Sequence, residues 1–248
     1  MEQRELPKKY KKDFPHSYAL GPFPTFELLS HRPKAVRAVY FREDFREREK
    51  LLSRCEKLGV PCLLWPRALE RVAQKEACYA AGEFLKYPGA LQPGAPHAAL
   101  VEPSDMGNLG TIMRTLLGFG VRNLALIGGG ADQWHPKVVR ASMGACFQLE
   151  TERFEDFPAY LQAHGQGREI FPFMLDGGRV LTPESCPQSP CYTLVFGNEA
   201  AGLPPVYQTY GQSLFIPQSS AVDSLNLAVS VAIGTFLFTQ KNPAGMEK

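Results

Sequence analysis

The stretch YTLVFGNEAAGLP (192–204) decides the fold class of this chain of 248 residues. Its apolar first half is typical of a buried strand, and Gly197, Asn198 and Glu199 end that strand in a turn of small residues. Glu199 therefore follows a buried strand directly, at the carboxyl edge of a sheet, where a carboxylate needs a polar partner or water. The alternative is a turn that holds Asn198 and Glu199 in solvent.

Strand and helix patterns alternate on both sides of this stretch. Strands are expected at 97–102, 123–128, 145–150, 169–175, 192–197 and 213–217. Helices are expected at 108–119, 136–142, 157–164 and 224–240. This order predicts an open, mostly parallel α/β sheet with helices on both faces, and such sheets bind ligands at the carboxyl ends of their strands.

The first third of the chain reads as a separate α/β unit. The patterns predict a strand at 35–41, a helix at 45–59, a strand at 60–65 and a further helix at 67–78. The stretch YPGALQPGAPH (87–97) contains three Pro and two Gly residues, which indicates a domain boundary. The expected organisation is a flexible basic arm (1–18), an N-terminal domain (19–95), a larger domain (96–242) and a C-terminal tail (243–248).

The charge is unevenly distributed along the chain. The formal net charge is +2, but residues 1–95 hold 18 Lys and Arg against 12 Asp and Glu, a net of +6, and residues 96–248 hold 9 against 13, a net of −4. A basic first part favours contact with a polyanion. No apolar run reaches the roughly 18 residues that span a bilayer, and the N-terminus lacks the apolar core of a secretory signal. Six cysteines without a C-x-x-C pair and five scattered histidines predict free thiols in a reducing cytoplasm and no metal site.

Two further loops carry polar residues in unusual places. In SDMGNLGTIMRTLLGFGV (104–121), Asn108 is the expected N-cap of a helix, and Arg114 falls outside its buried stripe, either solvated or in contact with a phosphate or ribose. In IPQSSAVDSLNLAVSVAIGTFLF (216–238), Asp223 or Ser224 is the expected N-cap. Asn226 then lies in the first turn of an apolar helix. A buried Asn without partners costs about 1–3 kcal/mol, so we expect it to bond nearby backbone, a neighbouring loop or a ligand.

Together these loops resemble the three motifs of the SpoU/TrmH family of RNA ribose methyltransferases, in the SPOUT class. NLGTIMRT resembles the first motif, FGNEAAGLP the second and IPQSSAVDSLNLAVSVAI the third, within about residues 98–240. HPKVVRASMGA (135–145) is also similar to the family. Residues 25–95 look more loosely like the ribosomal-protein-like RNA-binding domain that many members carry. Ala200, where the family usually has Gly, and Pro204, where it often has Ser, depart from the second motif.

The resemblance implies a C-terminal SPOUT domain with a parallel sheet and a deep trefoil knot, an obligate homodimer, and S-adenosylmethionine held in the knot. The catalytic residues that it implies are Asn108, Arg114, Glu199, Ser224 and Asn226. The residues implied for the methyl donor are Leu194, Val195, Phe196, Gly197, Asn198, Gly202, Ile216, Pro217, Ser224 and Leu225. Arg114 would act either as a base or, because a guanidinium stays protonated, as a clamp on phosphate and ribose. It could come from the opposite subunit.

The implied reaction is methylation of a ribose 2′-hydroxyl in structured RNA, with 23S-type ribosomal RNA favoured over transfer RNA. The residues expected to contact RNA phosphates are Lys8, Lys9, Lys11, Lys12, Arg32, Lys34 and Arg37. A merely solvated basic tail is the alternative for the stretch KKYKK. Two other functions compete: a catalytically silent RNA-binding protein of ribosome assembly on the same fold, and a nucleotide-dependent oxidoreductase, which the lack of a G-x-G-x-x-G motif disfavours.

Overall fold

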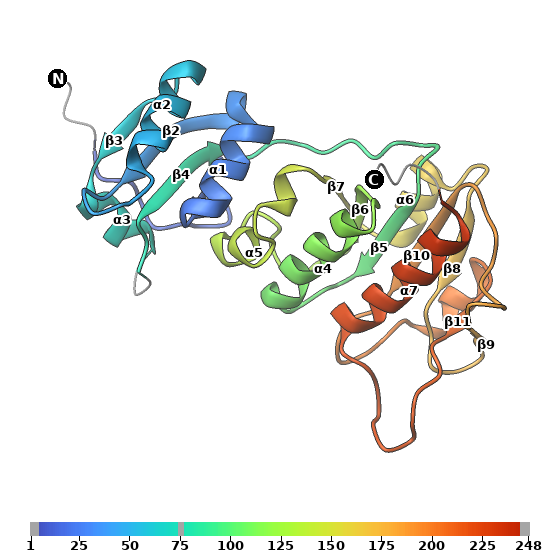
Figure 1. Cartoon of the computed structure of the whole chain (residues 1–248). Helices are drawn as coiled ribbons and strands as arrows, with labels where there is room; N and C mark the ends of the chain where they lie inside the picture. Colours follow the sequence, from blue (N-terminus) through green and yellow to red (C-terminus); the bar gives the residue numbers. More distant parts are fainter. Residues whose placement is uncertain (1–4, 74–76, 244–248) are drawn as a thin grey trace. The chain divides into compact units, whose positions relative to one another are not determined.

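The computed structural model describes residues 5–73 and 77–243, which form two compact units (Figure 1). The first unit combines the chain up to Tyr87 with residues 132–148, and the second combines residues 88–131 with the chain from Leu149 onward. The boundary between Tyr87 and Pro88 falls in the stretch rich in proline and glycine. Residues 1–4 of the expected arm and 244–248 of the expected tail lie outside the described residues.

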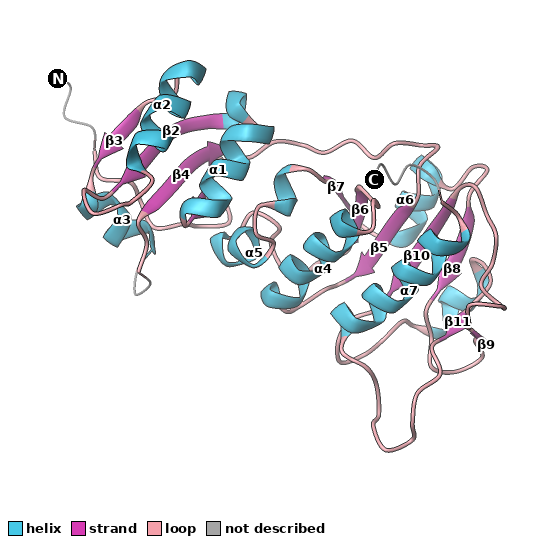
Figure 2. Cartoon of the chain, in the orientation of Figure 1, coloured by secondary structure: helices cyan, strands magenta, loops and turns pink. Residues whose placement is uncertain are grey.

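The first unit contains a four-stranded sheet in the order β1-β4-β2-β3 (Figure 2). Its strands are β1 (His16–Leu20), β2 (Val36–Phe41), β3 (Cys62–Leu64) and β4 (Ala80–Leu85). Its helices are α1 (Pro22–His31), η1 (Pro33–Ala35), α2 (Arg48–Leu58), α3 (Pro66–Ala73), α5 (Pro136–Ala141) and η2 (Ala145–Phe147). The expected strand, helix and strand are confirmed as β2, α2 and the parallel β3. The left-handed Gly59 ends α2, as a glycine at that position favours.

Four elements of the first unit were not predicted: β1, α1, η1 and β4. Strands β1 and β4 pair antiparallel with each other, β4 also pairs with β2, and α1 packs against β4. Because β1 begins at His16, the regular fold starts inside the stretch expected to be a flexible arm. The last expected residues of the helix at 67–78 include 74–76, which lie outside the described residues.

The second unit is built on a five-stranded sheet, β7-β6-β5-β10-β8, in which every neighbouring pair is parallel. Its strands are β5 (His97–Val101), β6 (Asn123–Ile127), β7 (Glu150–Phe154), β8 (Glu169–Pro172) and β10 (Tyr192–Phe196), with the small parallel pair β9 (Arg179–Val180) and β11 (Leu214–Phe215). Its helices are α4 (Met106–Gly118), α6 (Phe157–His164), η3 (Pro205–Thr209) and α7 (Leu227–Lys241). The expected α/β class with a parallel sheet is confirmed.

The two faces of this sheet are covered by different helices (Figure 2). Side chains of a strand alternate between faces, and β10 follows this rule. Tyr192 packs against Phe238 of α7 at a ring distance of 5.0 Å. Thr193, the next residue, meets Tyr160 of α6, with 2.6 Å between the hydroxyl oxygens. All five residues of β10 are buried, as its apolar sequence predicts.

The strand expected at 145–150 is wrong. Residues 145–147 form the short helix η2, and the strand β7 begins only at Glu150. Ala145, Cys146 and Phe147 are all buried, and a short run of apolar residues does not distinguish a buried strand from a helical turn. Gly144, with a φ of 78°, makes the tight turn that starts the helix. Among the described residues, no helix has the length and apolar character that a membrane crossing needs.

Candidate active site

Glu199 joins the loop after β10 to the loop after β5. These strands are neighbours in the parallel sheet, so their carboxyl ends lie side by side. One carboxylate oxygen of Glu199 accepts hydrogen bonds from the backbone N–H (2.9 Å) and the hydroxyl (2.8 Å) of Ser104, and the other accepts from the backbone N–H of Asp105 (3.1 Å). The polar partners expected for Glu199 are therefore Ser104 and Asp105, the residues immediately before α4.

A chain of amide side chains extends this contact to the third loop. The Nδ2 of Asn108 donates to Glu199 at 3.3 Å, and the Oδ1 of Asn108 accepts from the Nδ2 of Asn226 at 3.1 Å. Asn226 also accepts from the backbone N–H of Ala228 at 2.9 Å. Asn226 thus bonds both its own helix and a neighbouring loop. Three segments that lie far apart in sequence meet in one network.

The helices that carry the network begin at other residues than expected. The N-cap of α4 is Asp105, whose carboxylate accepts from the backbone N–H of Asn108 at 2.7 Å, so Asn108 is not the cap. The N-cap of α7 is Asn226, not Asp223 or Ser224. All three loops are rich in residues that can cap a helix, and the tertiary contacts decide which of them does so.

The carboxyl group of Glu199 is strongly acidic in this setting. Burial by itself would raise its pKa, but the hydrogen bonds from the backbone and hydroxyl of Ser104, with those from backbone N–H groups, outweigh burial and lower the pKa from 4.5 to about 2. The positive end of α4 acts in the same direction. Glu199 therefore remains ionised and serves as a fixed acceptor that holds the network.

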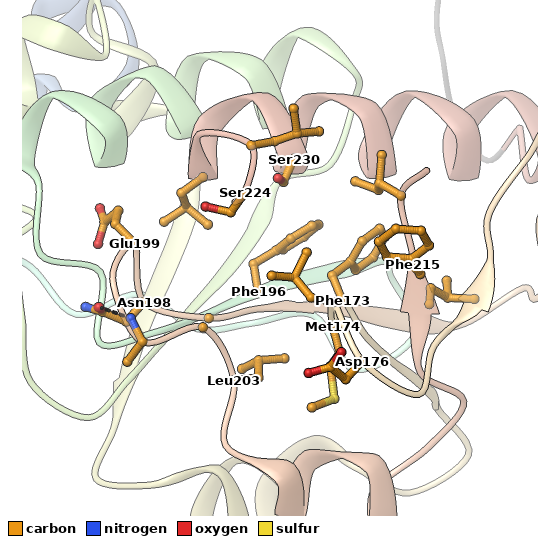
Figure 3. A pocket seen from close by; sticks show the side chains of 18 of the residues that line it. Phe173, Met174, Asp176, Phe196, Asn198, Glu199, Leu203, Phe215, Ser224 and Ser230 are labelled. Carbon is orange, nitrogen blue, oxygen red and sulfur yellow. Dashed lines mark hydrogen bonds between the residues drawn. The ribbon is translucent and has the colours of Figure 1, made fainter. Parts of the chain in front are cut away.

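A cavity of about 390 Å³ lies beside this network. Figure 3 shows Phe173, Phe196 and Phe215 gathered along it, with Glu199 and Ser224 at its polar side. The rings of Phe173 and Phe196 stack at 4.3 Å between centroids. A volume of this size suits a small ligand, and pockets that bind such ligands combine apolar walls with a few polar groups.

Most residues predicted to hold a methyl donor line this cavity. These are Phe196, Gly197, Asn198, Gly202, Ile216, Ser224 and Leu225. Leu194 and Val195 are buried inside β10 instead, and Pro217 is not among the lining residues. The predictions omitted several lining residues, among them Phe173, Asp176, Gln208 and Phe215. They follow β8 or belong to η3 and β11, and only their expected position near strand ends could have indicated them.

The glycine-rich turn at 197–202 is tightly closed. A Cβ atom on Gly197 would lie 2.1 Å from the backbone carbon of Gly202, so only glycine fits there. The side chain of Asn198 fastens the turn, because it accepts from the backbone N–H groups of Ala200 and Ala201 and donates to the carbonyl of Glu102 at 2.7 Å. Ala200, one of the two departures from the family motif, is exposed and is accommodated in this turn.

The SpoU rRNA methylase family model matches residues 96–236, which include all three loops of the site. The chain belongs to this family. It is 26% identical over 205 residues to the 23S rRNA (guanosine(2553)-2'-O)-methyltransferase RlmP of Bacillus subtilis, covering 81% of this chain and 79% of the relative. It is 34% identical over 144 residues to an uncharacterized tRNA/rRNA methyltransferase of Synechocystis sp., covering 56% of this chain and about half (52%) of the relative's length.

Solved structures agree with this SpoU assignment. The AdoMet-bound rRNA methyltransferase of Sinorhizobium meliloti superposes with a TM-score of 0.76 at 25% identity, covering 91% of this chain and 87% of that one. The SpoU methyltransferase AviRb of Streptomyces viridochromogenes in complex with AdoMet gives 0.79 at 21% identity, covering 93% and 92%, a likeness that concerns the fold alone. The predicted family is confirmed.

Arg114 of this SpoU family chain is not part of the network. It is exposed on α4 and is not among the residues that line the cavity. Arg114 lies six residues after Asn108, which corresponds to about 240° around a helix, so the two side chains leave α4 in different directions. Arg114 shares the exposed or half-exposed face of α4 with Leu117 and Gly118.

The residues predicted to contact RNA divide into two groups. Lys8, Lys9, Lys11, Lys12 and Lys34 are exposed or half-exposed on the first unit. Arg32, by contrast, is half-buried: it donates to the carbonyl of Phe147 at 2.9 Å, and its guanidinium lies over the ring of Tyr87 at 4.9 Å. Arg37 pairs with Glu83 at 3.1 Å. Arg37 keeps 49% of its side chain exposed despite this ion pair, whereas Arg32 is held by the backbone and by a ring. No local sequence pattern reveals these contacts.

Proposed function

We propose that this SpoU family protein transfers a methyl group from S-adenosylmethionine to a ribose 2′-hydroxyl of structured RNA, with ribosomal RNA of the 23S type as substrate. The observation that carries the proposal is the network from Glu199 through Asn108 to Asn226 beside a cavity of about 390 Å³. The network joins the three family motifs at one edge of a parallel sheet, where such sheets bind ligands. The name of the Bacillus relative supports ribosomal RNA; transfer RNA is the alternative.

The cavity fits the donor in size and chemistry. Gly197 and Gly202 line the cavity without side chains, and the rings of Phe173 and Phe196 provide an apolar wall for a nucleoside. The donor would lie against these residues and the backbone near Ile216 and Leu225. When bound, S-adenosylmethionine supplies a methyl group on a positively charged sulfur. The protein holds the acceptor oxygen in line with that methyl group, and positioning of this kind supplies several kcal/mol.

Arg114 would bind the phosphate and ribose of the target nucleotide. A guanidinium remains protonated in proteins, so it suits the role of a clamp that stabilises negative charge developing on the 2′-oxygen better than the role of a base. Its direction away from Asn108 supports an action on the site of a second subunit. Asn108, Ser224 and Asn226 would position the ribose and backbone, with Glu199 orienting them.

The proposal includes a homodimer formed through α4 and α7. Val229 and Phe236 leave 46% and 47% of their surface exposed on α7, and Phe236 packs beside Phe119 at the end of α4. An apolar face of this kind suits burial against a second copy of the chain. The same proposal includes the deep trefoil knot, the RNA-binding module at 19–95 and the methyltransferase module at 96–242, which family membership supports. It also includes a cytoplasmic location, which the six free cysteines support.

Methylation of purified ribosomal and transfer RNA with a radiolabelled methyl donor tests this function. We expect incorporation into ribosomal RNA, and Arg114→Ala should lower the rate at least a hundredfold while calorimetry shows donor binding unchanged. A rate near that of the wild type would overturn the role of Arg114. If the wild-type protein bound no methyl donor, this would instead indicate a catalytically silent RNA-binding protein.

Mixing two inactive variants tests whether Arg114 acts across the dimer. Subunits with Arg114→Ala retain an intact network, and subunits with Asn226→Ala retain the arginine. If the arginine serves the partner's site, mixed dimers contain one complete site and activity returns. If mixed dimers form and stay inactive, Arg114 does not act across the interface. Mapping 2′-O-methylated positions in RNA from a deletion strain then identifies the target nucleotide.

A further inference from the structure

The stretch KKYKK, expected to be flexible, is fastened to the first unit at its central residue. The hydroxyl of Tyr10 donates to the carboxylate of Asp132, and the Tyr10 ring meets that of His135 edge-on at 5.4 Å. The ammonium group of Lys86 lies over the same ring, 4.8 Å from its centre. Three side chains from two distant segments therefore hold Tyr10 against the unit.

The backbone on both sides of Tyr10 is also held. The hydroxyl of Tyr18 donates to the carbonyl of Lys8 at 2.7 Å, and Lys86 donates to the carbonyl of Lys12 at 2.7 Å. A turn follows, in which the N–H of Phe14 donates to the carbonyl of Lys11 at 3.1 Å. Residues 8–12, here called the lysine ribbon, are thus tied at both ends and in the middle. This corrects the expectation of a flexible arm for these residues.

The lysine ribbon places four positive charges at the surface of the first unit. The side chains of Lys8, Lys9, Lys11 and Lys12 are all exposed. Asp13 is the one acidic residue between Lys8 and Phe14. Like charges repel, so a fixed strip of ammonium groups is stabilised when an anion with several charges lies along it. A fixed strip also loses less conformational freedom on binding than a mobile tail does.

We propose that the lysine ribbon is a preformed contact site for the phosphate backbone of RNA, with Tyr10 as its positioning residue. RNA as the partner rests on the function proposed above. The ribbon contacts phosphates and not bases, so it contributes affinity without sequence preference. Its contribution depends on salt, because each lysine that neutralises a phosphate releases condensed counterions.

Salt-dependent binding of a fluorescently labelled RNA hairpin, measured by anisotropy on the full chain without methyl donor, tests the proposal. The double variant Lys11→Gln with Lys12→Gln should weaken binding about tenfold and lower the slope of log affinity against log salt by about 1.5. The control changes Arg54 and Lys57, on α2 of the same unit, to Gln. It should leave the slope unchanged. An unchanged slope in the ribbon variant, or an equal loss in the control, would overturn the proposal.

Tyr10→Phe separates positioning from charge. This variant keeps the ring under Lys86 but loses the hydroxyl that bonds Asp132. All four lysines remain, so we expect a few-fold loss of affinity with an unchanged salt slope. Wild-type affinity would show that Tyr10 does not position the ribbon. These measurements involve neither methyl donor nor methyl transfer. Weaker binding by the ribbon variant would therefore support the ribbon even if the protein methylated no RNA. If the protein is an active methyltransferase but the ribbon variant binds RNA normally, only the ribbon proposal is refuted, not the proposed function.

Discussion

Replacing Glu199 with glutamine tests the physical basis of the active-site network. Each carboxylate oxygen of Glu199 accepts two hydrogen bonds, from the N–H and hydroxyl of Ser104 on one side and from Asp105 and Asn108 on the other. In the glutamine side chain an NH₂ group, which cannot accept, takes the place of one of these oxygens. At least one backbone N–H at the start of α4 then faces another donor, while the volume of the side chain is nearly unchanged.

The expected loss of stability follows from the pKa of Glu199. One pH unit corresponds to about 1.36 kcal/mol, so the fall from 4.5 to about 2 sets an upper limit of about 3 kcal/mol. The side chain is partly exposed, and solvent screening reduces this limit. We therefore expect Glu199→Gln to lower the free energy of unfolding by about 1–2 kcal/mol at neutral pH, measured by urea denaturation.

The same reasoning predicts a pH dependence. A carboxyl group whose pKa is lowered on folding stabilises the protein above its unfolded pKa of 4.5, and this contribution disappears as the pH falls towards 2. The stability difference between wild type and Glu199→Gln should therefore shrink over this range, whereas Glu155→Gln, an exposed control on the same unit, should have little effect at any pH. A variant as stable as the wild type at pH 7, or a difference that persists at low pH, would refute the reasoning.

Three other substitutions test the cavity, the core and the proposed dimer. Gly197→Ala places a Cβ atom 2.1 Å from backbone across the turn and should weaken binding of the methyl donor at least tenfold by calorimetry, whereas Gly129→Ala, with open space around it, should not. Arg168→Met removes a buried guanidinium that donates to four backbone carbonyls at 2.6–3.1 Å and should lower the free energy of unfolding by about 3 kcal/mol in urea; an unchanged midpoint would contradict this. Phe236→Glu should shift the protein to a monomer in analytical ultracentrifugation, while Gln240→Glu on the same helix should not; a dimeric Phe236→Glu variant would rule out this interface.

Local patterns predicted the elements around the site well. The apolar spacing from Leu109 to Leu116 predicted the buried stripe of α4, and the run at 192–196 predicted the central strand β10. These patterns succeed because helices and strands have fixed periods of side-chain direction. They failed at residues 145–147, where three buried residues in a row fit either period, and at the caps of α4 and α7, where several neighbouring residues can accept the same N–H groups.

The linker shows how tertiary contacts change the meaning of a sequence signal. The division between the two units falls within it, between Tyr87 and Pro88, but its proline and glycine residues did not indicate that residues 88–96 belong to the second unit. There Arg168 binds the carbonyls of Pro93 and Ala95, and Asn123 accepts from the N–H of Gln92 at 2.8 Å. These partners lie 31 to 75 residues away along the chain, beyond the reach of any local pattern.

The sequence by itself determined the α/β class, the family and the polar residues of the three loops, because strand periodicity and motif spacing are local properties of the chain. Only the tertiary structure decided that Glu199, Asn108 and Asn226 form one network and that Arg114 lies outside it. It also decided that Tyr10 fastens the lysine ribbon to Asp132. Hydrogen bonds and charge contacts act over a few ångströms in space. Residues more than ninety positions apart meet only after the fold has brought their segments together.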